Sequence, residues 1–479
     1  MIKVPSQTVI GNQPRLFVMA VLGTTLLAGL SGCGSQVSDD GSASSVTDIT
    51  VPPTVTTTRP PPNVPSSSTT TTTTLPPTTT TTTVLWDLPD PYVDQVEALI
   101  GTVESLRGRS FLFRPWVGRV SIEEMVAGGI EAAPLDERDY MKHFFELLGM
   151  LASGTDWETL YSALEDSFVR PIYAPPEGVL IPDRSLPLDE YGSLLLVGEL
   201  TKALAHQHHP DSYHPEVDLD LDGGDQALAR RALHEGEAVL VQTLYLESLG
   251  EDRTALIYEQ AAAATDPGSD PDLSALANVP RLAVEERVFP GQDGANLAFD
   301  LYRRGGFAAL DQAFERPPDT TEQVLHLEKY RAQEPAARPN PFRVVLEGYE
   351  TVEDGTWGEL RWRGLFSHHG DPVSAARSAE GWGGDLYQLL WEPDSRKLVF
   401  AARLTADSFQ DESEYNAAIR NLVREGMDVG DSRVIDTTTE WVGADYAMLS
   451  WDIGVLTLVV ASDTEAGQLA AAQLGINLQ

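Results

Sequence analysis

The sequence predicts an α+β protein: a mostly helical unit over residues 88–338, followed by a smaller unit over residues 339–479 that mixes strands and helices. A chain of 479 residues is too long for one ordinary core, so two folded units are expected. Apolar residues recur at helical spacing in the first unit, whereas the second unit contains short apolar runs bounded by turn residues. Hydrophobic residues make up 42% of the chain, which is enough for buried cores.

Residues 1–33 have the features of a lipoprotein signal peptide. Two basic residues, Lys3 and Arg15, precede an apolar run over residues 16–30, which is short for a membrane span and ends in small residues. Residues 30–33, Leu-Ser-Gly-Cys, resemble the bacterial lipobox, in which the cysteine is lipidated. Because Cys33 is the only cysteine, no internal disulfide can form. We therefore expect an extracytoplasmic protein that lipid on Cys33 anchors to the cell membrane; a transmembrane anchor is the alternative.

Residues 34–87 are rich in Ser, Thr and Pro and predict a disordered tether. Such a composition cannot bury a core, and proline favours extended polyproline II structure. At about 3.1 Å per residue, some fifty residues would reach at most about 150 Å. We expect this linker to hold the folded units away from the membrane.

The acidic composition excludes one class of partner. The formal net charge is −39, with 72 acidic and 33 basic residues. Binding a phosphate backbone requires Lys and Arg side chains that displace counterions, so we expect no nucleic-acid partner. The acidity keeps a surface-exposed protein soluble.

Two helices are expected at the centre of the first unit. A β-hairpin, with strands within residues 167–173 and 178–181, precedes a helix over residues 188–208, which begins with acidic residues and ends near Pro210. A second helix is expected over residues 225–248.

The first of these helices contains Gly198-Glu199-Leu200-Thr201-Lys202, a variant of the zinc-peptidase pattern H-E-x-x-H. In that pattern the two histidines share a helix face and hold the metal, and the glutamate activates the bound water. Here the glutamate is retained as Glu199. Glycine has no side chain, and a charged lysine has no lone pair to offer a metal, so neither Gly198 nor Lys202 is a ligand.

The surroundings resemble a family of gluzincin-type (HExxH…E) metallopeptidase lipoproteins of actinobacteria. Four segments are similar to the family patterns AHELTHALQDQHF, ALVEGDA, RPPTSTEQILHPEKY and GWGGDRY: LVGELTKALAHQH (residues 196–208), ALHEGEA (232–238), RPPDTTEQVLHLEKY (316–330) and GWGGD (381–385). The resemblance covers most of residues 95–470. It implies a gluzincin-like peptidase domain over residues 88–338 and an α+β domain over residues 339–479.

The resemblance implies a role for each matching position. Glu199 corresponds to the general base and Glu235 to the third, carboxylate metal ligand, while Gly198 and Lys202 replace the two histidine ligands. His326 corresponds to a residue that could stabilise an oxyanion; a helix-capping or core histidine is the alternative. The Gly-x-Ala sequence after Glu235 would let the two central helices approach closely.

The loss of both histidines predicts a pseudo-peptidase without a metal cofactor, because one carboxylate cannot hold zinc. Glu199 and His326 would be vestigial. Gly198, Lys202 and Glu235 would line a vestigial cleft that binds a peptide or protein ligand or serves as a scaffold. Removing the metal would leave Glu199 and Glu235 facing each other, so we expect the Lys202 ammonium to occupy the space between them. The alternative is a Lys202 side chain that extends to solvent.

An active hydrolase with a relocated metal site is the second hypothesis. His206 and His209 are spaced i and i+3, so both can face one side of a helix and bind zinc. Residues 218–223 also resemble the start of a calcium loop, but its twelfth position is Ala229, where a bidentate glutamate is required.

The second unit offers no catalytic pattern. Strands are expected over residues 387–391, 397–402, 446–451 and 455–461, with helices over residues 412–425 and 463–474. No nucleophile–base pair or metal-ligand spacing stands out among them.

Overall fold

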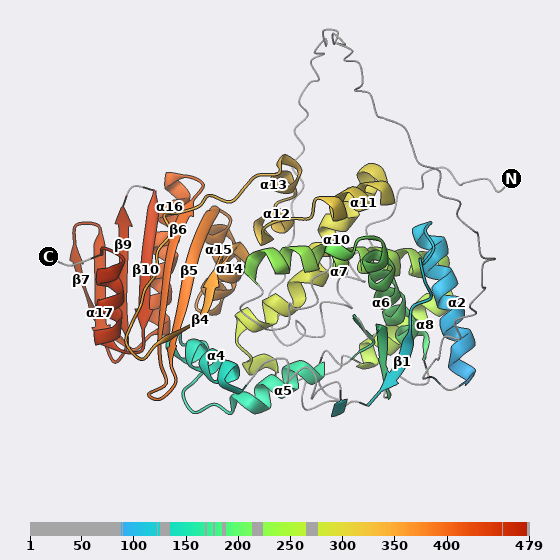
Figure 1. Cartoon of the computed structure of the whole chain (residues 1–479), viewed down its shortest axis with the longest axis horizontal. Helices are drawn as coiled ribbons and strands as arrows, with labels where there is room; N and C mark the ends of the chain where they lie inside the picture. Colours follow the sequence, from blue (N-terminus) through green and yellow to red (C-terminus); the bar gives the residue numbers. More distant parts are fainter. Residues whose placement is uncertain are drawn as a thin grey trace, which may run out of the picture. The chain divides into compact units, whose positions relative to one another are not determined.

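The computed structural model describes Leu88 and residues 90–121, 123–124, 135–167, 170–175, 178–183, 188–212, 224–264, 276–452 and 454–476 (Figure 1). The signal peptide with Cys33 and the tether over residues 34–87 lie outside this part, so both stay predictions. Helices and two sheets make up the described part, which confirms the α+β class, with a mostly helical region and a smaller sheet region. Among the described helices, none has the length and apolarity needed to cross a bilayer.

The helical region contains the two predicted central helices. Its α-helices are α2 (Asp90–Arg107), α4 (Leu135–Leu147), α5 (Trp157–Ser167), α6 (Glu190–His208), α7 (Gly224–Ser248), α8 (Glu251–Ala264), α10 (Arg281–Gly305), α11 (Phe307–Glu315), α12 (Thr321–Leu325) and α13 (Leu327–Ala332), with short 3₁₀ turns η2 (Pro210–Ser212) and η4 (Leu276–Asn278). The start of α6 is fixed locally, because the Asp189 carboxylate accepts a hydrogen bond of 2.7 Å from Gly192 N.

A small sheet precedes α6 and includes the predicted hairpin. Its strands are β1 (Val117–Val120), β2 (Ile172–Ala174) and β3 (Gly178–Pro182), in the order β1-β3-β2. The hairpin pair β2–β3 is antiparallel, whereas β1 runs parallel to β3. The sequence did not predict β1.

The sheet region is built on seven antiparallel strands in the order β4-β5-β6-β10-β9-β8-β7. Its elements are β4 (Glu350–Gly355), α14 (Glu359–His368), α15 (Pro372–Ala379), β5 (Trp382–Glu392), β6 (Lys397–Ala406), α16 (Phe409–Gly426), β7 (Val429–Ile435), β8 (Thr438–Gly443), β9 (Tyr446–Asp452), β10 (Val455–Ala461) and α17 (Thr464–Gln473). The predicted strands and helices of this unit are all present, and β4, β7, β8, α14 and α15 are additions.

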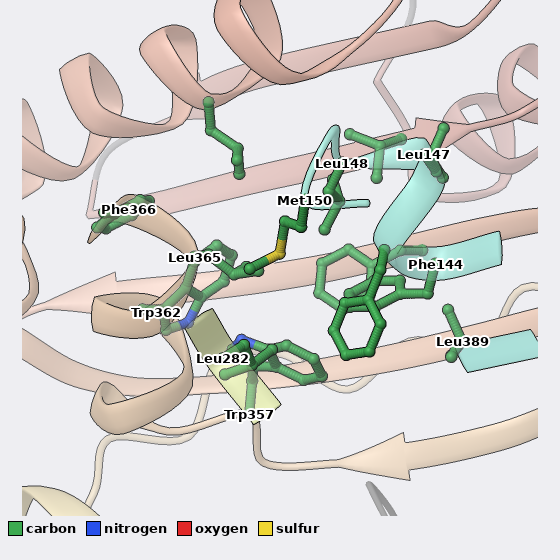
Figure 2. Packing of buried hydrophobic residues seen from close by; sticks show 14 of the residues in the cluster. Phe144, Leu147, Leu148, Met150, Leu282, Trp357, Trp362, Leu365, Phe366 and Leu389 are labelled. Atoms are coloured by element: carbon green, nitrogen blue, oxygen red, sulfur yellow. The ribbon is translucent and has the colours of Figure 1, made fainter. Parts of the chain in front are cut away.

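The largest hydrophobic core joins the sheet to helices from much earlier in the chain. Side chains of α4, α5 and the start of α10 are buried with residues of α14, α16, β5, β6 and β10. Phe144 on α4 lies with its ring centroid 5.7 Å from those of Trp357 and Phe400. Figure 2 shows Phe144 and Trp357 among the residues of this core. This core therefore crosses the boundary at residues 338/339 that the sequence suggested.

Helices α7 and α10 approach each other through glycines. A β-carbon on Gly236 would lie 2.1 Å from Gly294 O, and one on Gly294 would lie 2.0 Å from Ala232 O. From the sequence, Gly236 was expected to bring α7 close to α6, and that expectation is wrong about the partner. The glycine faces α10, because α7 packs between both helices and its small residues lie on the α10 side.

Candidate functional site

The candidate site lies where α6 crosses α7, and its centre is a lysine between two carboxylates. Lys202 Nζ lies 2.7 Å from Glu199 Oε2, one turn away on α6, and 2.9 Å from Glu235 Oε1 on α7. Glu199 and Lys202 are each only 6% exposed. The expected bridge is therefore confirmed, and the alternative of a Lys202 side chain that extends to solvent is wrong.

The hairpin that precedes α6 holds Glu199 in place. Tyr173 N, on β2, donates a hydrogen bond of 2.7 Å to Glu199 Oε2, the same oxygen that contacts Lys202. The Tyr173 hydroxyl lies 2.7 Å from His206 Nδ1, one further turn along α6. The carboxylate that the family resemblance places as general base is thus bonded to a backbone amide and to an ammonium.

The two carboxyls differ in their electrostatic surroundings. Burial raises the pKa of Glu199, and the charge of Glu235 raises it further, against the opposing effect of Lys202. Burial would also raise the pKa of Glu235, but Lys202, Arg231 and Arg170 together lower it. The cluster therefore keeps Glu235 ionised and makes Glu199 the more readily protonated of the pair.

A side chain at position 198, the position of the first histidine ligand, would require the Gln242 amide to move. A β-carbon there would lie 2.6 Å from Gln242 Nε2 on α7. This nitrogen also donates a hydrogen bond of 2.9 Å to Leu194 O, and Gln242 is buried. The amide of Gln242 therefore fills the space beside Gly198, a feature that the sequence did not reveal.

The histidines of the alternative zinc site are engaged with separate partners. His206 bonds to the Tyr173 hydroxyl, whereas His209 Nε2 lies 3.1 Å from Arg109 Nη1 and its ring stacks on Phe314 at 5.0 Å. Burial lowers the pKa of both imidazoles. Within the described ranges, no group of three His, Cys, Asp or Glu side chains is placed to hold a metal ion. Residues 218–223 of the calcium-like segment are outside those ranges.

His326 lies at the junction of α12 and α13, where it contacts α14. Its Nε2 is 2.9 Å from Glu359 Oε1. Burial would lower the pKa of His326, but the hydrogen bond and charge of Glu359 raise it. None of the contacts described for His326 involves Glu199, Lys202 or Glu235. His326 stands at the N-cap position of α13 but its side chain makes no capping hydrogen bond, so its contact with Glu359 fits the core alternative, and a role toward an oxyanion stays a prediction.

Two of the family-like segments form a buried polar network. The Asp385 carboxylate of the GWGGD segment accepts hydrogen bonds from four donors: Trp357 N, Gly358 N, Trp362 Nε1 and Trp382 Nε1. Thr321 donates its hydroxyl to Asp225 Oδ1 at 2.5 Å and its backbone N–H to Asp225 Oδ2 at 2.9 Å. This network ties the start of α7 to α12, and the same Thr321 hydroxyl accepts from Leu360 N of α14.

A cavity of about 40 Å³ adjoins the lysine bridge. Its walls include Gly198, Glu199 and Glu235 together with three arginines from separate segments: Arg170, Arg231 and Arg287. The sequence did not predict this cluster, because the three arginines are far apart in the chain and only the tertiary fold brings them together.

The chain was compared with protein-family models, with curated proteins and with solved structures, and it matches none of them. The resemblance to gluzincins therefore still depends on the sequence segments quoted above.

Proposed function

We propose that the protein is a lipid-anchored cell-envelope protein whose metallopeptidase-like domain is catalytically inactive and binds a peptide or protein ligand. The observation that carries this proposal is the Lys202 ammonium between Glu199 and Glu235, where the family resemblance would place the metal.

An ammonium can supply one positive charge where zinc would supply two, but it cannot supply the chemistry of the metal. Zinc accepts lone pairs from its ligands and lowers the pKa of a bound water to about 7. A lysine ammonium only donates hydrogen bonds, so it cannot generate a hydroxide nucleophile. Glu199 Oε2 already accepts from Tyr173 N and contacts Lys202 Nζ, which opposes its use as a base toward water.

The second hypothesis, an active hydrolase with a relocated zinc, has less support. Binding zinc through His206 and His209 would require His206 to leave the Tyr173 hydroxyl and His209 to leave Arg109. A third protein ligand would also be needed.

Metal analysis of the full-length protein in neutral detergent tests the proposal. After exposure to zinc and extensive dialysis, we expect far less than one zinc per chain and no chelator-sensitive cleavage of an unstructured protein substrate. Stoichiometric zinc that is lost on His206→Ala or His209→Ala would overturn the proposal in favour of the relocated site.

A further inference from the structure

The cavity beside the lysine bridge concentrates positive charge in a strongly acidic protein. Arg170 precedes β2, Arg231 lies on α7 and Arg287 lies on α10, and all three side chains line the cavity. Lys202 contacts Glu199 and Glu235, the two carboxylates that also line this cavity. Among the described residues, the three arginines of the cavity and Lys202 thus lie near two carboxylates, Glu199 and Glu235. The whole chain, by contrast, has 72 acidic and 33 basic residues.

Two of the arginines, Arg170 and Arg231, act on the same carboxylates as the lysine. Arg231 and Arg170 both lower the pKa of Glu235, and Arg170 also lowers that of Glu199. A guanidinium has five N–H donors in a planar fork, so an arginine that already has an acidic partner keeps donors for another group. All three arginines are partly exposed, and a ligand can therefore reach them from solvent.

The size of the cavity limits the group that fits. At about 40 Å³ the cavity is small, so it suits one small charged group rather than a bulky side chain. Arginine forks bind carboxylates through two parallel hydrogen bonds, so a carboxylate suits a cavity lined by three arginines.

We propose that this cavity binds the carboxylate of a ligand, held by Arg231, Arg287 and Arg170 next to the lysine bridge. The inference deepens the proposed function and rests on it, because it names the chemical group that the inactive cleft recognises. The terminal carboxylate of a peptide and a small free carboxylic acid present the same group.

Calorimetric titration of the full-length, chelator-treated protein in neutral detergent tests the inference. The probes are tri-alanine, tri-alanine amide, acetate and inorganic phosphate, each at the same ionic strength adjusted with chloride. We expect saturable binding of tri-alanine and none of its amide. Binding of acetate as tight as that of tri-alanine would identify a site for small acids, whereas much tighter binding of tri-alanine would identify a peptide terminus.

Two arginine variants and one control complete the test. Arg231→Gln and Arg287→Gln should each weaken tri-alanine binding at least about tenfold, because each removes a charged hydrogen-bond donor. Arg424→Gln, on the exposed side of α16, should bind like the parent protein. Arg231→Lys keeps the charge without the fork and should fall between the parent and Arg231→Gln.

The failure of this inference can be told apart from failure of the proposed function. A zinc-free protein that binds neither tri-alanine nor acetate would overturn the carboxylate site and leave the inactive peptidase standing. Equal binding of tri-alanine and its amide, equal affinity in Arg287→Gln, or binding of phosphate alone would also overturn it. Stoichiometric zinc would instead contradict the proposed function itself.

Discussion

Gly198 on α6 lies so close to the side-chain amide of Gln242 on α7 that a β-carbon at position 198 would be 2.6 Å from Nε2. The first histidine of the H-E-x-x-H pattern is therefore not simply missing. The neighbouring helix fills the space beside its backbone position, and Lys202 fills the space between the carboxylates.

This packing predicts that restoring the sequence motif does not restore the metal. The double variant Gly198→His/Lys202→His recreates H-E-x-x-H, but the new imidazole at position 198 would collide with Gln242. We expect it to hold far less than one zinc per chain after dialysis. Adding Gln242→Ala should open the space and bring zinc towards one per chain. Metal analysis of both variants checks this, and stoichiometric zinc in the double variant would show that Gln242 is no barrier.

Removing the lysine charge should destabilise the protein strongly. Lys202→Met keeps most of the side-chain volume but removes the ammonium that contacts both Glu199 and Glu235. We expect a loss of about 3–5 kcal/mol in the free energy of unfolding, measured with urea. Adding Glu235→Gln should recover most of the loss, because one of the two facing charges disappears.

An exposed ion pair provides the matched control for this change. Lys397 Nζ lies 2.8 Å from Asp463 Oδ2, but its side chain is 41% exposed, against 7% for Lys202. Lys397→Met should therefore cost less than about 1 kcal/mol. Similar losses for the two methionine variants would contradict a special role for the buried bridge.

Stability should fall as the pH rises through the neutral range because of Glu353. This side chain is buried beside Tyr387, whose hydroxyl lies 3.1 Å from Oε2, and burial raises the pKa of Glu353 to about 8. Between the ordinary value of 4.5 and about 8, the folded protein keeps a proton that the unfolded chain releases. The contribution of Glu353 to the free energy of unfolding is therefore complete below a pH of 4.5 and is lost as the pH approaches 8.

Glu353→Gln imitates the protonated carboxyl and should remove the part of this dependence that Glu353 contributes. At a pH of about 5 the variant should match the parent, and at about 8.5 it should be more stable by a few kcal/mol in urea unfolding. Glu347→Gln, at an exposed loop position, should leave the pH profile unchanged. A parent protein whose stability is flat between these two pH values would disprove the assignment.

Lipid on Cys33 should determine where the protein is found. In the parent protein we expect membrane association and a mass that includes the lipid, because the predicted signal peptide ends in Leu-Ser-Gly-Cys. Cys33→Ser should release the protein from the membrane fraction and remove the lipid mass. Unchanged fractionation together with an unchanged mass would contradict lipidation.

The parts of the fold that the sequence predicted correctly are those with local causes. The start of α6 depends on Asp189, which caps its first turn, and its end on Pro210 two residues beyond. The lysine bridge was also predictable, since Glu199 and Lys202 are one turn apart and the family-like segment placed Glu235 opposite them.

The missed features depend on partners that are distant in the sequence. Strand β7 is exposed along most of its length, so it has no apolar alternation, and pairing with β8 alone makes it a strand. Gln242 and the three cavity arginines belong to no sequence motif. They come together only when α7, α10 and the segment before β2 pack around the cavity. An amphipathic pattern also shows that α4 buries one face but does not identify what covers it.

The partners of Phe144 have a consequence for the biogenesis of the protein. Trp357 and Phe400 are synthesised long after Phe144, so the Phe144 ring lacks these two neighbours until the sheet strands follow. A chain that crosses a membrane in order from its amino terminus would leave the ring without them throughout the passage. Completion of the fold would then wait for the last strands to emerge, and a chain cut short before them would be a substrate for chaperones and proteases rather than a partly working protein.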